Sequence, residues 1–329
     1  MSKRNQGILI CFAIAILAWY LGTLVPLVGG PVFGILLGMV LALGLSDSVA
    51  KIKEGATFSG KKILQLSVIL LGFEMNIFRV LEVGKESLYV MAFTLTSAFL
   101  AAWFFGKLLK IDRVTGILIG VGTSICGGSA IAATAPVVNA TDKEVAHSIS
   151  TIFLFNIGAV FVFPFLGHLF QMSDTGFGIW AGTAVNDTSS VLATSYSFSD
   201  ESGKLATIVK LTRTLMIIPL TFVLSIYMSR QNREGAESKF SLRKAFPYFV
   251  IGFVLTAMLN TSGILPPAFS KGLATLGKFF IVVAMVGIGL NTHLGQLIRN
   301  GIRPILLGFC CWVTLAVTSL IVQNFLGLL

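Results

Sequence analysis

The chain has 329 residues, of which 55% are hydrophobic and 12% are charged, with 24 Lys and Arg against 14 Asp and Glu. Together with a mean hydropathy of +0.89, this composition excludes an ordinary soluble domain and a disordered chain, because both carry far more polar and charged residues. The composition therefore predicts a polytopic membrane protein with little room for a soluble domain.

Eleven apolar segments are candidates for transmembrane helices, each of which needs about 20 mostly apolar residues. In chain order they cover residues 8–25, 31–45, 63–77, 88–106, 114–138, 147–167, 176–197, 205–228, 245–260, 273–292 and 304–325. The first segment contains Trp19 and Tyr20 and leads to no small-residue cleavage site, so we expect a retained helix and not a signal peptide. The predicted fold class is an all-α membrane protein of about 11 transmembrane helices.

The net charge of +10 follows the predicted topology and does not indicate a nucleic-acid partner. Sixteen of the 24 basic residues fall on alternate loops, namely Lys3, Arg4, Lys51, Lys53, Lys61, Lys62, Lys107, Lys110, Arg113, Arg230, Arg233, Lys239, Arg243, Lys244, Arg299 and Arg303. Six fall on the other loops, namely Arg79, Lys85, Lys143, Lys204, Lys271 and Lys278. Because cytoplasmic loops are enriched in Lys and Arg, we expect a multi-pass protein of the bacterial inner membrane with a cytoplasmic N-terminus and an outside C-terminus.

Short repeated strings predict two inverted halves. FGILLG at 33–38 recurs as FGIWAG at 177–182, and SGK at 59–61 recurs at 202–204. This pairing shifts the chain by five helices, so the second copy runs in the opposite direction. It predicts an extra helix in residues 1–30 and inverted five-helix repeats in residues 31–170 and 171–329. A rival pairing aligns GTSICGGSAIAAT (122–134) with GTAVNDTSSVLAT (182–194).

The string TSICGGSAIAATAP (123–136) predicts a helix that is broken inside the membrane, because Gly is unfavourable in helix interiors. We expect residues 126–129 to be unwound and their amides to form a donor-rich site. The inverted pairing matches this break with MVGIGLNTHLG (285–295), which contains Asn291. Small residues that allow close helix packing are the alternative explanation.

Two basic residues, Lys210 and Arg213, lie three positions apart on one face of the segment 205–228. Charges at membrane depth cost at least about 2.5 kcal/mol each, so they usually face a partner or a cavity. One interpretation is an anion site, since Arg offers a planar fork and Lys a point charge. The alternative is a pair of buried salt bridges with Asp187 or Glu74.

The run from Asn186 to Ser190 is the most polar inside any segment. It predicts either a pathway lined by hydroxyl groups or a simple helix cap. Glu74 and His293 are candidates for a functional role. The alternative for Glu74 is a solvated position at a helix end, and the alternative for His293 is an ordinary hydrogen-bonded polar side chain. The four cysteines and three histidines lack metal-ligand spacing, so we expect neither a metal nor an organic cofactor.

Three motifs carry a resemblance to a known family: TSICGGSAIAATAPVV, GTAVNDTSSVLA and VKLTRTLMIIP. Over nearly its whole length the chain resembles a bacterial family named for sulfate export, also known as a family of uncharacterised conserved membrane proteins. That family is distantly similar to the bile acid and sodium symporter type of fold, in which two discontinuous helices cross at the site. The resemblance implies a secondary transporter of a small anion, with sulfate as a candidate.

The sequence thus favours alternating-access transport of a small inorganic or sulfonate-like anion, coupled to H⁺ or Na⁺. The candidate substrate-binding residues are Lys210, Arg213, Ser124, Cys126, Gly127, Gly128, Ser129, Asn186, Thr188, Ser189 and Asn291, and the coupling candidates are Asp187, Glu74 and His293. An anion channel and an intramembrane enzyme are the alternatives, although no cluster of catalytic groups points to an enzyme. No nucleotide-binding motif occurs, and a homodimer stays open.

Overall fold

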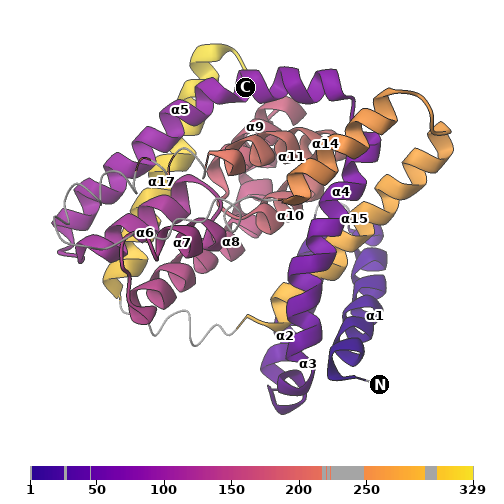
Figure 1. Cartoon of the computed structure of the whole chain (residues 1–329), viewed down its shortest axis with the longest axis horizontal. Coiled ribbons are helices and arrows are strands. Elements are labelled where there is room, and N and C mark those ends of the chain that lie inside the picture. Colours follow the sequence, from indigo (N-terminus) through magenta and orange to yellow (C-terminus); the bar gives the residue numbers. More distant parts are fainter. Residues whose placement is uncertain are drawn as a thin grey trace.

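The structure is a computed structural model, and it describes residues 2–25, 28–44, 46–216, 220, 223, 248–292 and 302–328. In that part of the chain the regular elements are helices joined by turns (Figure 1). The helices are α1 (Lys3–Leu24), α2 (Gly29–Gly44), α3 (Ser46–Phe58), α4 (Leu64–Leu71), α5 (Ile77–Leu108), α6 (Arg113–Ser124), α7 (Gly128–Thr134), α8 (Asp142–Leu169), α9 (Asp174–Ala184), α10 (Thr188–Phe198), α11 (Asp200–Leu215), α14 (Tyr248–Thr261), α15 (Pro267–Leu290) and α17 (Ile302–Leu326). Two short helical stretches, η1 (Ser59–Ile63) and η2 (Gly72–Glu74), follow α3 and α4 and make residues 46–74 one nearly continuous rod.

Five of the described helices, α1, α5, α8, α15 and α17, are long and apolar enough to cross a membrane, and α2 and α14 are shorter apolar helices. Large apolar side chains such as Tyr89, Trp103 and Phe165 are exposed on the outward faces of these helices. Exposed apolar surface on this scale suits a lipid environment and not water. A helical, multi-pass membrane protein is therefore confirmed.

The helices form two bundles (Figure 1). In the first bundle, on the right of the view, α15 packs against α2, α3 and α4, α1 packs against α2 and α3, and α14 lies beside α4. The second bundle consists of α5 to α11 and α17, with α5 beside α17 and α9 and α10 beside α11. Helix α10 joins the bundles, since it contacts α2 and α15.

Two of the predicted membrane spans are interrupted. The segment 114–138 contains α6 and α7 separated by residues 125–127, and the segment 176–197 contains α9 and α10 separated by residues 185–187. The first break confirms that the helix is interrupted at TSICGGS, but it covers residues 125–127 and not the predicted 126–129, since Gly128 and Ser129 belong to α7. The second falls at the start of the polar run at 186–190, whose residues 188–190 already belong to α10, and the rival pairing had aligned this region with the first break.

The predicted break in the segment 273–292 is wrong, because α15 continues to Leu290 and Asn291 caps its end. Its glycines serve close packing instead: a Cβ on Gly287 would lie 2.5 Å from the carbonyl oxygen of Ala56, and one on Gly289 would lie 2.4 Å from that of Ile35. The five-helix inverted pairing is thus not supported at its second break, and the division at residues 30 and 170 stays a prediction.

Candidate functional site

The first interrupted segment is a re-entrant hairpin, because its second arm returns toward the start of its first arm. A Cβ on Gly122 of α6 would lie 2.9 Å from the side chain of Ile131 of α7, whereas nine residues along a straight helix span about 13 Å. Val114 at the start of α6 and Val145 at the start of α8 belong to one apolar cluster. We call residues 113–134 hairpin 1 and residues 125–127 its tip.

The second interrupted segment is also a hairpin. The Ser199 hydroxyl, directly after α10, donates a hydrogen bond of 2.6 Å to Asp174 at the start of α9. The rings of Phe177 and Phe198 stack with their centroids 3.9 Å apart. We call residues 174–198 hairpin 2 and residues 185–187 its tip.

The two hairpins enter the second bundle from opposite ends. Helix α8 has 28 residues, or about 42 Å at 1.5 Å per residue, and it links the end of hairpin 1 to the start of hairpin 2. Lys143 therefore lies at the same end of the bundle as Lys110, whereas the sequence had placed these two lysines on opposite sides. The sequence had suggested two spans because a segment of about 20 apolar residues fits a span and a folded hairpin equally well.

Lys210 of α11 joins the two tips. Its side chain is 0% exposed, and its Nζ donates to the carbonyl oxygens of Ile125 at 2.7 Å, of Val185 at 3.2 Å and of Asn186. An ammonium group has three donors, so these three carbonyls use all of them.

Arg213 joins the hairpins one turn further along α11 and is also 0% exposed. Its Nε donates to the carbonyl oxygen of Ser124 at 2.6 Å and its Nη2 to that of Thr123. Its Nη1 donates to the carbonyl oxygens of Thr183 and, at 3.4 Å, of Val185. The guanidinium therefore binds the last carbonyl groups of the first arm of both hairpins.

These contacts satisfy the backbone carbonyl groups that the two helix breaks leave free. The last carbonyls of a helix lack intrahelical partners and carry partial negative charge, and lipid offers no hydrogen bonds to satisfy them. Lys210 and Arg213 supply both the donors and the opposite charge. Backbone oxygens use all three donors of Lys210 and four of the five donors of Arg213, so the predicted direct contact with an anion is left to the second N–H of Arg213 Nη2.

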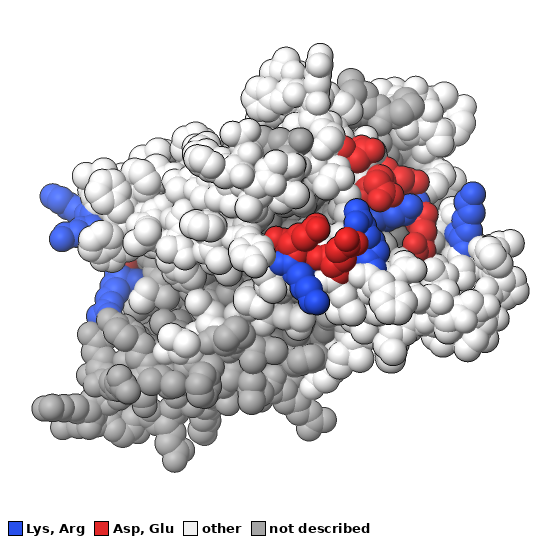
Figure 2. Space-filling model, turned by 90° about the horizontal axis from the view of Figure 1, so that it is seen from above, with Lys and Arg blue, Asp and Glu red and all other residues white. Residues whose placement is uncertain are grey.

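Glu74 is not a partner of either cation. Its carboxylate lies 3.3 Å from Lys204 Nζ and 3.2 Å from Lys278 Nζ. Lys204 also lies 3.6 Å from Glu201, and Lys278 lies 2.8 Å from Asp200. Figure 2 shows acidic and basic side chains gathered on the face of the molecule that is seen from above. We call these five residues the inter-bundle ion-pair network, because Glu74 of η2 and Lys278 of α15 belong to the first bundle and the other three, on α11, to the second.

Asp187 caps α10, which confirms the helix-cap interpretation of the polar run. Its Oδ2 accepts hydrogen bonds from the backbone N–H of Ser189 at 3.0 Å and from the Ser189 hydroxyl. Asp187 and Thr188 are half-buried. Asn186 is 1% exposed, and its amide oxygen and nitrogen have no partner among the described residues.

The tip of hairpin 1 holds the predicted small residues together. Cys126 is buried, Gly128 is half-buried and Ser129 is exposed. Gly127 has φ +66°, a conformation that side chains with a Cβ rarely adopt. A Cβ there would lie 3.6 Å from Cβ of Asp187, so the two tips approach each other directly.

Other predicted residues lie elsewhere. Asn291 donates to the carbonyl oxygen of Gly287 at 2.9 Å at the end of α15, in the first bundle, and His293 lies outside the described residues. Ser124 contributes its carbonyl oxygen to Arg213, while its hydroxyl donates to Gly120 at 2.6 Å.

The sequence analysis missed Asn156, which lies in the middle of α8 and is 2% exposed. Its Oδ1 accepts a hydrogen bond of 3.3 Å from the backbone N–H of Asp187 in the tip of hairpin 2. Its Nδ2 lies 3.6 Å from the place where a Cβ on Gly127 would be, in the tip of hairpin 1. A single amide inside the apolar string FLFNIGAVF was the one available signal, since intramembrane polar residues commonly serve function.

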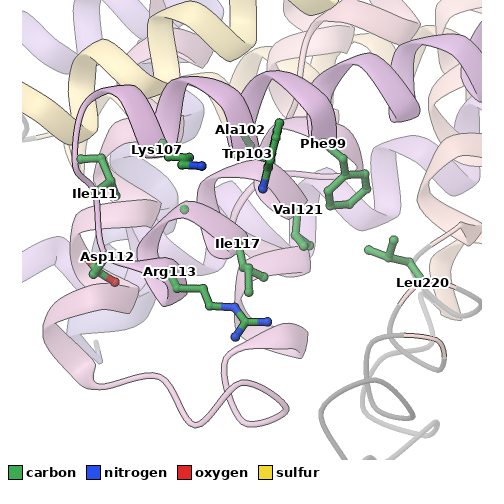
Figure 3. A pocket seen from close by; sticks show the side chains of 12 residues that line it. Phe99, Ala102, Trp103, Lys107, Ile111, Asp112, Arg113, Ile117, Val121 and Leu220 are labelled. Carbon is green, nitrogen blue, oxygen red and sulfur yellow. The ribbon is translucent and has the colours of Figure 1, made fainter. Parts of the chain in front are cut away.

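A cavity of about 480 Å³ lies between α5 and α6, away from the residues that the sequence had predicted (Figure 3). Phe99, Trp103, Ile117 and Val121 form its apolar lining, and Lys107 is among the residues that line it. None of the predicted site residues contributes to it. The candidate site is therefore the pair of hairpin tips with Asn156, Lys210 and Arg213.

Comparison with known proteins agrees with a membrane protein. Residues 6–308 match the model of the family described as conserved hypothetical protein 698. A UPF0324 membrane protein of Fusobacterium nucleatum is 46% identical over 348 aligned residues that cover 100% of both chains. Another from Streptococcus pyogenes serotype M6 is 51% identical, with 99% of this chain and 98% of the relative covered. A third, from Streptococcus mutans, is 47% identical with the same coverage. The chain therefore belongs to the conserved hypothetical protein 698 family, whose relatives here are UPF0324 membrane proteins.

Proposed function

We propose that this protein is a secondary transporter that carries a small anion across the bacterial inner membrane by alternating access. The observation that carries the proposal is the meeting of two hairpin tips, from opposite ends of the bundle, around the buried cations Lys210 and Arg213. Broken helices at membrane depth are tolerated where protein or a water-filled cavity covers the free backbone groups, and in transporters they commonly mark the binding site.

The charge of the tips favours an anion. Two buried cations face one carboxylate, Asp187, among the described tip residues. The carbonyl ends of α6 and α9 offset part of the positive charge, yet a net positive potential remains in a medium where charge is poorly screened. Lys210 and Arg213 attract the anion mainly through this field, since backbone oxygens use all but one of their donors.

The hairpins also suggest how access alternates. Hairpin 1 lies between the tips and one end of the bundle, and hairpin 2 lies between the tips and the other end. Displacement of one hairpin opens the tips to one side of the membrane, while the other hairpin keeps the opposite side closed. The predicted orientation, with the N-terminus in the cytoplasm, places hairpin 1 on the basic, cytoplasmic side.

Asp187 is the coupling residue in this proposal. Its half-buried carboxylate at the tip binds H⁺ or Na⁺ together with the anion. The bound cation offsets part of the negative charge of the loaded site and so lowers the free-energy cost of the change in access. The chain needs no further cofactor for this role and acts as a transporter and not as an enzyme.

The first test is thermal unfolding of the purified protein with sulfate, sulfite, methanesulfonate, acetate and chloride at constant ionic strength. A ligand at about 100 times its Kd stabilises the native state by roughly 2.7 kcal/mol, so one anion class should raise the unfolding midpoint above the others. The second test is counterflow in proteoliposomes, where a trapped unlabelled anion should accelerate uptake of the same labelled anion. Saturable counterflow supports a carrier, and a non-saturating current without counterflow supports a channel. The absence of both stabilisation and flux for every anion would overturn the proposal.

A further inference from the structure

The position of Asn156 carries an inference about the ligand that deepens, and rests on, the proposed function. We propose that Asn156 is a substrate-binding residue, whose Nδ2 donates a hydrogen bond to one oxygen of a small oxyanion held between the hairpin tips. The inference assigns a direct contact to a residue of α8, whereas Lys210 and Arg213 act through their charge.

The orientation of the Asn156 amide is fixed by its neighbour. The backbone N–H of Asp187 is a donor, so the side-chain atom that faces it at 3.3 Å must be the oxygen. The nitrogen therefore faces away from Asp187 N–H and toward Gly127 of the other tip. Asn156 thus accepts a hydrogen bond from the tip of hairpin 2 and turns its nitrogen toward the tip of hairpin 1.

The nitrogen has no hydrogen-bond acceptor among the described residues, and the side chain is 2% exposed. Buried polar groups are bonded in the great majority of cases, and an unpaired buried donor costs about 1–3 kcal/mol. An apolar side chain of the same shape would avoid this cost. The missing partner must be an acceptor, which a cation cannot provide.

The nitrogen lies beside the backbone of Gly127, which has no side chain to cover it. A Cβ on Gly127 would make ordinary contacts of 3.4 Å with Ile152, 3.6 Å with Asn156 Nδ2 and 3.6 Å with Asp187. A side chain at this position would lie against Nδ2, so glycine leaves that face of the nitrogen uncovered for a ligand oxygen.

A second unpaired amide supports the same ligand class. Asn186, in the tip of hairpin 2, is 1% exposed, and both of its polar amide atoms lack a partner among the described residues. Two unpaired amides near two buried cations favour an acceptor with several oxygens and a negative charge. Sulfate, sulfite, sulfonates and carboxylates share this chemistry, and chloride lacks the separate oxygens.

The test compares Asn156→Asp with Asn156→Leu and with the control Asn324→Asp, which makes the same chemical change on an exposed side chain of α17. Asn156→Asp keeps an oxygen for Asp187 N–H and replaces the donor by an acceptor. The probes are sulfate, methanesulfonate, acetate and chloride, read out as the shift of the unfolding midpoint and as the apparent Kd.

The expected result is stabilisation of the unchanged protein and of Asn324→Asp by an oxyanion, with weaker binding in both Asn156 variants. Loss of one charge-assisted hydrogen bond of about 1.5–3 kcal/mol corresponds to a Kd about 10 to 150 times higher.

Equal Kd values in Asn156→Asp and the unchanged protein would overturn the inference but leave the proposed function standing. Equal responses to chloride and to every oxyanion would also overturn it. If neither Asn156 variant folds, the amide is structural and the inference is wrong. If the unchanged protein responds to no anion and carries none, the proposed function itself fails.

Discussion

Phe177 near the start of α9 and Phe198 at the end of α10 stack with their ring centroids 3.9 Å apart and their planes at 13°. A helix of that length that crossed the membrane would separate the two rings by about 30 Å. Their contact means that hairpin 2 begins and ends on the same side. The corresponding fold-back of hairpin 1 makes the membrane topology directly testable.

Single cysteines at Lys110 and Lys143, on either side of hairpin 1, should be labelled from one side of the membrane by an impermeant maleimide. Single cysteines at Gln171 and Glu201, on either side of hairpin 2, should be labelled from the other. All four positions are exposed. The measurement uses a variant in which Cys11, Cys126, Cys310 and Cys311 are replaced, since these thiols are free. Labelling of Lys110 and Lys143 positions from opposite sides would show that residues 113–134 cross the membrane.

Replacement of Arg213 by Gln should destabilise the protein strongly. The change leaves carbonyl groups at the ends of α6 and α9 without donors. Removal of one partner from a buried charged interaction costs roughly 3–5 kcal/mol of stability. The measurement is the thermal unfolding midpoint in detergent. The control is Lys85→Gln, which removes a positive charge from an exposed position of α5 and should change the midpoint little. A stable Arg213→Gln protein that has merely lost anion binding would favour direct contact with the anion instead.

Gly127→Ala should be destabilising and Gly116→Ala stabilising. At Gly127 the φ of +66° and ψ of −128° strain any residue with a Cβ, at a cost of about 1–3 kcal/mol. Gly116 lies inside α6 with open space around its missing Cβ, so Ala should gain up to about 1 kcal/mol from helix propensity. Unfolding midpoints compare the two variants, and equal effects would contradict the conformation assigned to the tip.

The glycines of α15 should prove to be packing residues without a role in anion binding. Gly289→Ala places a Cβ 2.4 Å from the carbonyl oxygen of Ile35 and should cost about 1–3 kcal/mol by overpacking. Gly272→Ala, in the same helix with nothing within 4 Å, is the matched control. The anion-dependent shift of the midpoint should be the same in both variants, and its selective loss in Gly289→Ala would restore the predicted site in this segment.

Glu74→Gln should weaken the contact between the bundles. The carboxylate is 23% exposed and shared by Lys204 and Lys278, so its loss should cost roughly 1 kcal/mol, somewhat more than an exposed pair. Because salt screens such pairs, unfolding of the unchanged protein should depend on NaCl concentration more steeply than unfolding of the variant. Glu86→Gln, on an exposed position of α5, is the control and should retain the full salt dependence.

The sequence predicted the chemistry of the site better than its geometry. The Gly pair at 127–128 predicted a break, and the positions of Lys210 and Arg213 predicted buried cations, because both features are unfavourable in a plain membrane helix. The fold-back of the hairpins was not predictable from apolar length. The glycines at 287 and 289 resembled a break because glycine serves close packing and unwinding alike. The role of Asn156 was not predictable from the sequence, because its partner, the backbone N–H of Asp187, comes close to it only in the folded chain.

The inter-bundle ion-pair network allows the contact between the bundles to loosen in steps. Lys204 has both Glu74 and Glu201 within reach, and Lys278 has both Glu74 and Asp200. When α11 slides along η2 and α15, Lys204 can leave Glu74 and keep Glu201, while Lys278 can leave Asp200 and keep Glu74. Each lysine keeps one ion-pair partner throughout, so a small sliding movement costs far less free energy than full separation of the bundles. The two bundles are thereby held together firmly along the axis of separation and weakly along the direction of sliding.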